Sequence, residues 1–269
     1  METPEPNGYW SPLCRQIIDW ENNGKIGCFP GDGTLLWEGH SSFVFIPKEH
    51  PNCVIKIIKK GCKPYGVSPE EEYDLLKKLL ELKGELFITP TPRSRGSDPV
   101  YIAMDRLGKV FGWGVSDPNE VKRIGLAVGE FAGLLFLKHG SIHTDICLNN
   151  YTNGFDGKIG IIDIASIEKT DVPERMFLCP ILDPFNICLA MADKFEEVTG
   201  RPIDSDLFEK LSKERMEKLF EGRPPNVVSM IQGRHDANLE ELVSHLRGKQ
   251  KSCHRPVATQ DVNKFRMDI

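Results

Sequence analysis

The segment His143-Thr144-Asp145-Ile146-Cys147-Leu148-Asn149-Asn150 decides the fold when it is taken together with a second segment, Ile161-Ile162-Asp163-Ile164-Ala165. Asp145 lies five residues before Asn150, and Asp163 follows thirteen residues after Asn150, at the end of an apolar stretch. Three side chains that carry oxygen atoms therefore stand around a predicted pair of strands. Such a set can bind a cation and orient a hydroxyl group, so these residues are the first candidates for a site.

Transfer of a phosphoryl group needs the side chains that these two segments supply. A carboxylate must orient the attacking hydroxyl, and oxygen ligands must hold Mg²⁺ on the phosphates. Asp145 can serve as the carboxylate, while Asn150 and Asp163 can hold the cation. Each aspartate alone also has a simpler interpretation, as a residue of a turn, a helix cap or the end of a strand.

The two segments resemble the catalytic loop and the metal-binding motif of protein kinases, in which H-R-D-x-x-x-x-N is followed by D-F-G. The spacing from Asp145 to Asn150 matches that loop, and the further step to Asp163 suits the hairpin of the family. The resemblance implies ATP as the phosphoryl donor, with Asp145 as the catalytic carboxylate. It also implies Asn150 and Asp163 as ligands of Mg²⁺, for which Mn²⁺ is an alternative.

The upstream half carries further elements of the family in the same order. Lys56 ends the apolar run Val54-Ile55-Lys56 and resembles the strand lysine that pairs with the nucleotide phosphates. Glu72, with Glu71 as the adjacent alternative, resembles the helix glutamate that pairs with this lysine. Ser68, followed by a proline, predicts the start of that helix. The alternative interpretations are a solvent-facing lysine on an edge strand and a first-turn glutamate favoured by the helix dipole.

The remaining candidates would contact the nucleotide. Glu38 to Phe45 resembles a degenerate glycine-rich loop, because Trp37 and Ser42 stand where the family usually has glycine. Tyr101 to Gly108 resembles the strand and hinge that hold adenine, although an ordinary strand and turn would have the same residue types. The resemblance implies nucleotide contacts from Gly39, Ser41, Ser42, Val44, Lys56, Met104 as the gatekeeper, and the backbone of Asp105 and Leu107.

Several departures from the protein-kinase pattern bear on activity and regulation. Thr144 replaces the arginine that reads an activation-loop phosphate, so control by such a phosphate is not expected. Cys147 replaces a lysine that contacts the γ-phosphate, which bears on the rate. Asp183 resembles the aspartate that opens the central helix of the second lobe, and it follows Asp163 by only twenty residues. This spacing leaves too little room for an ordinary activation segment.

The order of the elements predicts an α+β protein with two lobes. The first lobe is β-rich and includes the helix of Glu72, and the second is reduced and mostly helical. The predicted parts are an N-terminal extension (1–34), the first lobe and hinge (35–108), the reduced second lobe (109–248) and a polar tail (249–269). This shortened plan resembles minimal bacterial effector kinases of the OspG and NleH type, and the metal motif without Phe-Gly resembles that of RIO kinases.

The leading hypothesis is a serine/threonine-protein kinase that phosphorylates a protein, which would be a host protein if the chain is a virulence effector. An activating host partner is a further expectation. Two alternatives stay open. A pseudokinase that binds nucleotide and a partner is favoured by Cys147 and the degenerate loop. A small-molecule kinase of the aminoglycoside or choline kinase type shares the motif of Asp145 and Asn150, but usually needs a larger second lobe.

Composition argues against several other classes. The 269 residues carry a net charge of -5, which argues against nucleic acid as the main partner. The longest apolar run, Gly125 to Leu137, is too short to span a bilayer. The eight cysteines show no metal-ligand spacing and predict reduced thiols in a cytoplasmic compartment. The first residues show no Sec-type signal, so an effector would be secreted into the host cell by another route.

Overall fold

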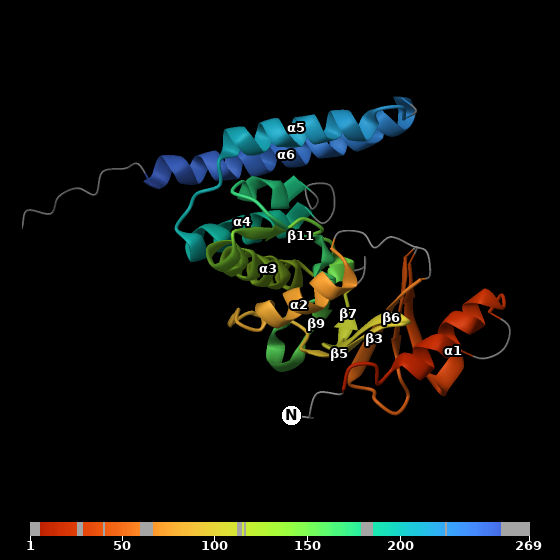
Figure 1. Ribbon diagram of the computed structural model, residues 1–269. Helices are drawn as coiled ribbons and strands as arrows, with labels where there is room; N and C mark the ends of the chain where they lie inside the picture. Colours follow the sequence, from red (N-terminus) through yellow and green to blue (C-terminus); the bar gives the residue numbers. More distant parts are fainter. Residues whose placement is uncertain are drawn as a thin grey trace, which may run out of the picture. The chain divides into compact units, whose positions relative to one another are not determined.

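The computed structural model describes residues 6–25, 29–39, 41–59, 67–111, 115, 117–178, 185–223 and 225–253. The chain divides into two compact units, Met1–Arg201 and Pro202–Ile269. The first unit combines β-sheets with helices, and the described part of the second consists of helices (Figure 1). The α+β class predicted from the sequence is therefore confirmed. Within the described residues, every helix is too short or too polar to cross a lipid bilayer.

A five-stranded antiparallel sheet in the order β1-β2-β3-β6-β5 forms the first part of the first unit. Its strands are β1 (Thr34–Glu38), β2 (Ser42–Ile46), β3 (Cys53–Ile58), β5 (Pro92–Ser97) and β6 (Val100–Asp105). Apolar runs rich in β-branched and aromatic residues predict strands over residues 42–46 and 53–58, and β2 and β3 occupy these residues. Residues 24–36 are rich in turn signals, but β1 begins within them at Thr34. Pairing with β2, in which Leu35 faces Phe45, overrides the local turn signals.

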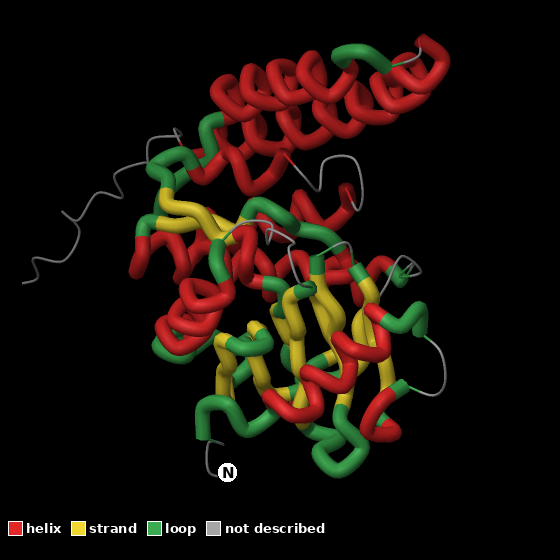
Figure 2. Tube along the Cα trace, turned by 45° about the vertical axis from the view of Figure 1, so that its right-hand side comes forward, coloured by secondary structure: helices red, strands yellow, loops and turns green. Residues whose placement is uncertain are grey.

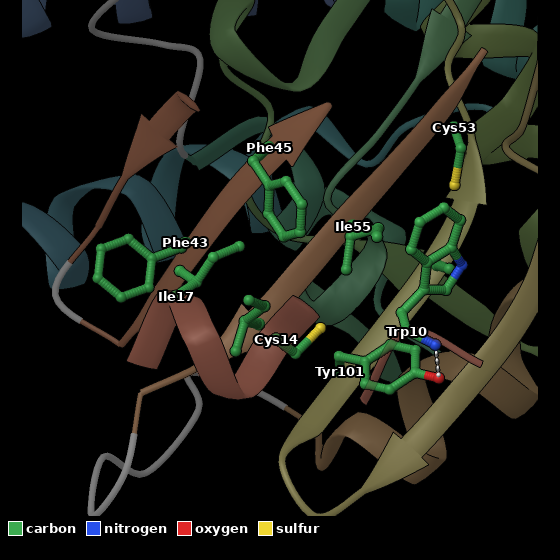
Figure 3. Packing of buried hydrophobic residues seen from close by; sticks show 10 residues of the cluster. Trp10, Cys14, Ile17, Phe43, Phe45, Cys53, Ile55 and Tyr101 are labelled. Carbon is green, nitrogen blue, oxygen red and sulfur yellow. Dashed lines mark hydrogen bonds between the residues drawn. The ribbon is translucent and has the colours of Figure 1, made fainter. Parts of the chain in front are cut away.

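Helix α1 (Ser11–Asn22) covers one face of this sheet (Figure 3). Its buried side chains pack against an apolar cluster from β2, β3 and β6, namely Phe43, Phe45, Cys53, Ile55, Ile57, Tyr101 and Ala103. The backbone N–H of Trp10 donates to the hydroxyl of Tyr101 at 3.1 Å and ties the start of α1 to β6. A short 3₁₀ helix, η1 (Pro30–Asp32), follows α1 and leads into β1.

Helix α2 (Pro69–Leu79) contacts the sheet from the side opposite α1. Ser68 and Glu71 form a capping box at its start, since each side chain accepts a hydrogen bond from the other residue's backbone N–H. The sequence predicts this start correctly. The capping box uses the carboxylate of Glu71 and leaves the buried Glu72, one position later, to face strand β3.

The second part of the first unit is built on two helices that approach closely, α3 (Pro118–His139) and α4 (Phe185–Thr199). Gly125, Gly129 and Gly133 of α3 line this contact, and a Cβ on Gly129 would lie 2.4 Å from the carbonyl oxygen of Met191. Only glycine permits this separation of the two backbones. The spacing of apolar residues over 118–137 predicts a helix there, and α3 covers these residues.

Short strands and 3₁₀ helices complete the first unit. One sheet has the order β4-β10-β9-β7, and a second pairs β11 with β8. The strands are β4 (Phe87–Ile88), β7 (Lys109–Val110), β8 (Ser141–His143), β9 (Tyr151–Asn153), β10 (Ile159–Ile161) and β11 (Ile167–Lys169). The 3₁₀ helices are η3 (Leu148–Asn150), η4 (Phe155–Gly157), η5 (Ile164–Ser166) and η6 (Pro173–Leu178).

The second unit contains two helices that lie side by side, α5 (Ser205–Phe220) and α6 (Pro225–Cys253) (Figure 2). Between them, the buried hydroxyl of Ser212 and the imidazole Nε2 of His235 are hydrogen-bonded at 2.8 Å. A groove of about 830 Å³ runs along the helix pair, and all its lining residues belong to this unit. Of the segment 249–269, residues 249–253 belong to α6, and the rest lies outside the described residues.

Candidate active site

The hairpin of β9 and β10 brings two of the predicted metal ligands to the same end of a sheet. Tyr151 pairs with Ile161 in the antiparallel register, so Asn150, just before β9, lies near Asp163, just after β10. The pairing continues one step further, because the backbone N–H of Ile162 donates to the carbonyl of Asn150 at 2.9 Å. The strand pair that the sequence predicts therefore sets this juxtaposition.

Asn150 is bonded to Asp145 through its amide nitrogen. Nδ2 of Asn150 donates to the backbone carbonyl of Asp145 at 2.8 Å and to the carboxylate Oδ2 at 3.1 Å. An amide that donates with its nitrogen offers its oxygen as an acceptor or a cation ligand. The hydrogen bonds also hold the Asp145 carboxylate in place, as a positioned acid or base requires.

Lys56 binds two carboxylates that come from elements far apart in the sequence. Its Nζ lies 2.9 Å and 3.0 Å from the two oxygens of Glu72 on α2 and 3.5 Å from Oδ1 of Asp163. The exposed fraction is 16% for the Lys56 side chain and 4% for Glu72, but 45% for Asp163. Lys56 is therefore bound by the buried carboxylate of Glu72 on one side and by the accessible carboxylate of Asp163 on the other.

The two ionisable partners of this pair respond to burial in opposite ways. Burial would lower the pKa of Lys56, but the charges of Glu72 and Asp163 and their hydrogen bonds outweigh it, so its pKa is raised. Burial raises the pKa of the Glu72 carboxyl, and the Lys56 ammonium counteracts that rise. At neutral pH Lys56 is therefore a fixed positive charge beside Asp163, suited to anionic groups.

Asp163 has a backbone conformation that is unusual for a residue with a side chain. Its φ of 54° and ψ of 61° lie in the left-handed region, directly before η5. The imidazole Nε2 of His143 lies 3.0 Å from the carbonyl oxygen of Asp163. Burial lowers the pKa of His143, which favours a neutral imidazole, and Nε2 must then carry the proton because a carbonyl only accepts.

Two predicted nucleotide contacts share the face of the sheet that carries Lys56. Val44 pairs directly with Lys56 across β2 and β3, and Met104 pairs with Val54, two residues before Lys56. Paired residues of antiparallel strands project from the same face, and so do residues two apart in one strand. Val44, Met104 and Lys56 therefore lie on one surface, opposite the cluster that α1 covers.

The predicted degenerate glycine-rich loop, Glu38 to Phe45, includes the last residue of β1 and most of β2. The N–H of Gly39 donates to the carbonyl of Ser42 at 2.9 Å, and a Cβ at Gly39 would lie 2.9 Å from the indole nitrogen of Trp37. The carbonyl of Ser41 accepts from the backbone N–H of Lys59 at 2.9 Å. Ser42 is buried in β2, whereas Ser41 is half-buried, so Ser41 is the better placed hydroxyl of the two.

The predicted hinge is already bonded within the protein. The N–H of Asp105 donates to the carbonyl of Thr91 at 2.9 Å, and its carboxylate binds Arg93 at 2.7 Å. The carbonyl of Leu107 accepts from the hydroxyl of Thr152 at 3.1 Å. The Asp105 N–H is therefore already engaged, and Thr152 is a hinge contact that the sequence reasoning missed.

The remaining predicted positions are distributed around the site. Cys147 is half-buried and lies in the loop between Asp145 and Asn150. The hydroxyl of Thr144 donates to the carbonyl of Ser166 at 2.9 Å, a contact that no sequence signal shows because it spans 22 residues. Asp183 lies outside the described residues.

The donor set suits a magnesium ion that is held partly by phosphates. Among the described residues, no group of three or more His, Cys, Asp or Glu side chains is arranged to hold a metal ion. Mg²⁺ needs fewer protein ligands, because it keeps waters and uses substrate phosphates. The accessible Asp163 carboxylate and the amide oxygen of Asn150 fit that role. Comparison with protein family models and with curated proteins found no match to this chain.

Proposed function

We propose that this chain is an ATP-dependent serine/threonine-protein kinase with a bilobal, protein-kinase-like architecture. The observation that supports this most strongly is the contact of Lys56 with both Glu72 and Asp163. Three elements that are distant in the sequence meet at Lys56: strand β3, helix α2 and the end of the β9–β10 hairpin. An ion pair between a strand lysine and a helix glutamate, beside a metal-binding aspartate, is the arrangement that phosphoryl transfer by protein kinases requires.

In this proposal each residue acts through a contact already present. Lys56 binds and orients the phosphates of ATP, and Glu72 fixes its ammonium group. Asp145 orients the serine or threonine hydroxyl of the substrate protein and accepts its proton. Asn150 holds Asp145 in position through its amide nitrogen. Val44 and Met104 form apolar walls for the adenine.

Asn150 and Asp163 would hold Mg²⁺, with Mn²⁺ as the alternative cation. When bound, the ion would neutralise charge on the phosphates. The Asp163 carboxylate is suited to this role because it is accessible, while Lys56 is shielded behind it. The neutral imidazole of His143 fixes the backbone of Asp163 without adding charge.

The test combines a binding measurement with a transfer assay. A ligand at 100 times its Kd stabilises the folded state by about 2.7 kcal/mol, so saturating Mg-ATP should raise the Tm measurably. Asp163→Ala should abolish the shift. Asp145→Asn should retain the shift and lose about 10²- to 10⁴-fold in transfer of labelled phosphate to protein extract. Asp171→Ala, which changes an exposed aspartate eight residues further along the chain, is the matched control.

The outcomes separate the alternatives. If neither Mg-ATP nor Mn-ATP raises the Tm of the wild-type protein, the proposal of a nucleotide site is contradicted. Full transfer by Asp145→Asn means that the proton acceptor lies elsewhere. Transfer to small hydroxylated acceptors instead of proteins would identify a small-molecule kinase.

A nucleotide-binding module without transfer activity is the second candidate. Cys147 favours it, because a thiol in the loop between Asp145 and Asn150 cannot supply the positive charge that a lysine brings to the γ-phosphate. Mg-ATP would then raise the Tm, but labelled phosphate would not be transferred. Cys147→Lys is informative here, since gain of transfer would identify the missing charge as the cause.

A further inference from the structure

The chain that follows Asp163 is fastened to earlier parts of the molecule at successive positions. The carbonyl of Ala165 accepts from the backbone N–H of Val67, just before the cap of α2, at 3.3 Å. Strand β11 then pairs with β8, with Ile167 opposite His143. At the far end, the N–H of Thr170 donates to the carbonyl of Gly140 at 3.0 Å. The segment is thus tied to α2 and to the end of α3.

Thr144 adds a side-chain bond to the carbonyl of Ser166, three residues after Asp163. Its backbone N–H and its hydroxyl both donate to the carbonyl of Ser166, at 3.0 Å and 2.9 Å. Any residue could make the first bond as part of the β8–β11 pairing. Only a hydroxyl-bearing side chain such as threonine or serine makes the second from this position, so this contact is specific to the residue present.

These hydrogen bonds stabilise the unusual backbone conformation of Asp163. A non-glycine residue in the left-handed region persists only where its surroundings over-determine it. Asp163 is held on its N-terminal side by the β10 hairpin and at its own carbonyl by His143. Two and three residues after Asp163, the bonds of Val67 and Thr144 hold Ala165 and Ser166. They close the turn from the other side.

We infer that Thr144 is a positioning residue that holds Asp163 ready for its cation, in place of a phosphate on the segment that follows. This inference rests on the proposed function. The Val67 bond links the same turn to the helix of Glu72, so the Lys56 pair and the cation ligand are assembled together. Phosphorylation of Ser166 or Thr170 is then not needed for activity.

The experiment compares Thr144→Val, which removes the hydroxyl but keeps the shape, with Thr144→Ser, which keeps the hydroxyl. The Mg²⁺ concentration that gives half of the ATP-induced Tm shift should be about tenfold higher in Thr144→Val than in wild type. This factor corresponds to the loss of one neutral hydrogen bond. Thr144→Ser should stay within about twofold of wild type. Thr170→Val removes the hydroxyl that accepts a hydrogen bond from the Val172 N–H further along the segment. It should not change the Mg²⁺ requirement.

Hydrogen exchange without ligand separates this inference from the proposed function. The amides of Val67, Thr144 and Ile167, which donate to the carbonyls of this turn, should exchange about tenfold faster in Thr144→Val and at the wild-type rate in Thr144→Ser. An unchanged Mg²⁺ requirement in Thr144→Val overturns the positioning role. Faster exchange in a protein that binds no Mg-ATP at all supports the fastening of the turn and rejects the kinase proposal. Loss of activity after phosphatase treatment overturns the claim that phosphorylation is not needed.

Discussion

The two faces of strand β3 differ in polarity: one is apolar, and the other carries a charged side chain. Cys53, Ile55 and Ile57 point to α1 and are fully excluded from solvent. Lys56, between Ile55 and Ile57, points to α2 and holds two carboxylates. Because side chains alternate along a strand, one residue of register separates an apolar core from a charged site (Figure 3 shows the apolar side).

The comparison indicates where stability and chemistry are located in this unit. On the α1 face, burial of apolar surface stabilises the sheet, and burial raises the pKa of Cys14 and Tyr101 so that both side chains stay neutral. On the α2 face, a buried ion pair contributes little net stability, because desolvation of the charges offsets their attraction. The ion pair is therefore best explained by a function, whereas the α1 face is explained by folding. Substitutions on the two faces should have different consequences.

The largest expected effect comes from breaking the ion pair on the α2 face. Lys56→Met leaves the buried carboxylate of Glu72 without its partner and should cost about 3–5 kcal/mol of unfolding free energy. The double variant Lys56→Met/Glu72→Leu should recover most of this loss, since an apolar pair needs no compensation. Urea unfolding of the single and double variants measures both. Lys78→Met, on the exposed side of α2, should change stability by less than about 0.5 kcal/mol.

The same variant has a defined pH dependence. Burial raises the pKa of Glu72, so the folded state holds this proton more tightly than the unfolded chain does. The contribution of the group to stability is then greatest at low pH and is lost as pH rises through the folded pKa. Without Lys56 to counteract the rise, Lys56→Met should lose more stability than wild type as pH rises above the ordinary pKa of a glutamate. A parallel decline in both proteins would contradict the assignment of the cost to Glu72.

The second effect, on the α1 face, should leave the chemistry unchanged. Ile55→Ala removes a fully buried side chain from the cluster and should cost about 2–5 kcal/mol. Under the proposed function, its KM for ATP should stay at the wild-type value when measured below the Tm of the variant. Leu36→Ala, whose side chain is 45% exposed on β1, is the control and should cost less than about 0.5 kcal/mol. A changed KM in Ile55→Ala would show that the two faces are coupled.

The sequence predicts several elements of the first unit because their signals are local. Strands β2 and β3 follow from runs of β-branched and aromatic residues, and α2 from the cap at Ser68. Strand β1 is missed because its stability comes from pairing with β2 after a turn-rich stretch. The packing of α1 on the sheet is missed for the same reason, since nothing in residues 11–22 specifies which surface their apolar side covers.

The sequence predicts the residues of the candidate site but leaves some of their contacts open and misses others. The sequence leaves Glu71 and Glu72 as alternatives, and the structure separates them, because Glu71 caps α2 and Glu72 binds Lys56. The bonds of Thr144 to Ser166 and of Thr152 to Leu107 are not predicted. Both join residues that are distant in sequence, and a threonine in either place is equally compatible with an ordinary strand end.

The smallest expected effect tests the attachment of α1 itself. Tyr101→Phe removes the hydroxyl that accepts the backbone N–H of Trp10 and leaves that buried donor unpaired, at a cost of about 1–3 kcal/mol. The loss is smaller than for Ile55→Ala because the ring stays in place and only the contacts of the hydroxyl disappear. Exchange of the α1 amides, residues 11–22, should become faster while those of β3 and β6 stay protected, since the bond ties only the start of the helix to the sheet.

Tyr9→Phe is the matched control, because Tyr9 adjoins Trp10 but is 48% exposed. It should leave both the unfolding free energy and the exchange of α1 nearly unchanged. Uniformly faster exchange across the whole sheet in Tyr101→Phe would mean that α1 and the strands unfold as one cooperative unit. The α1 face would then not be a separable cover, and the contrast between the two faces of β3 would be one of chemistry alone.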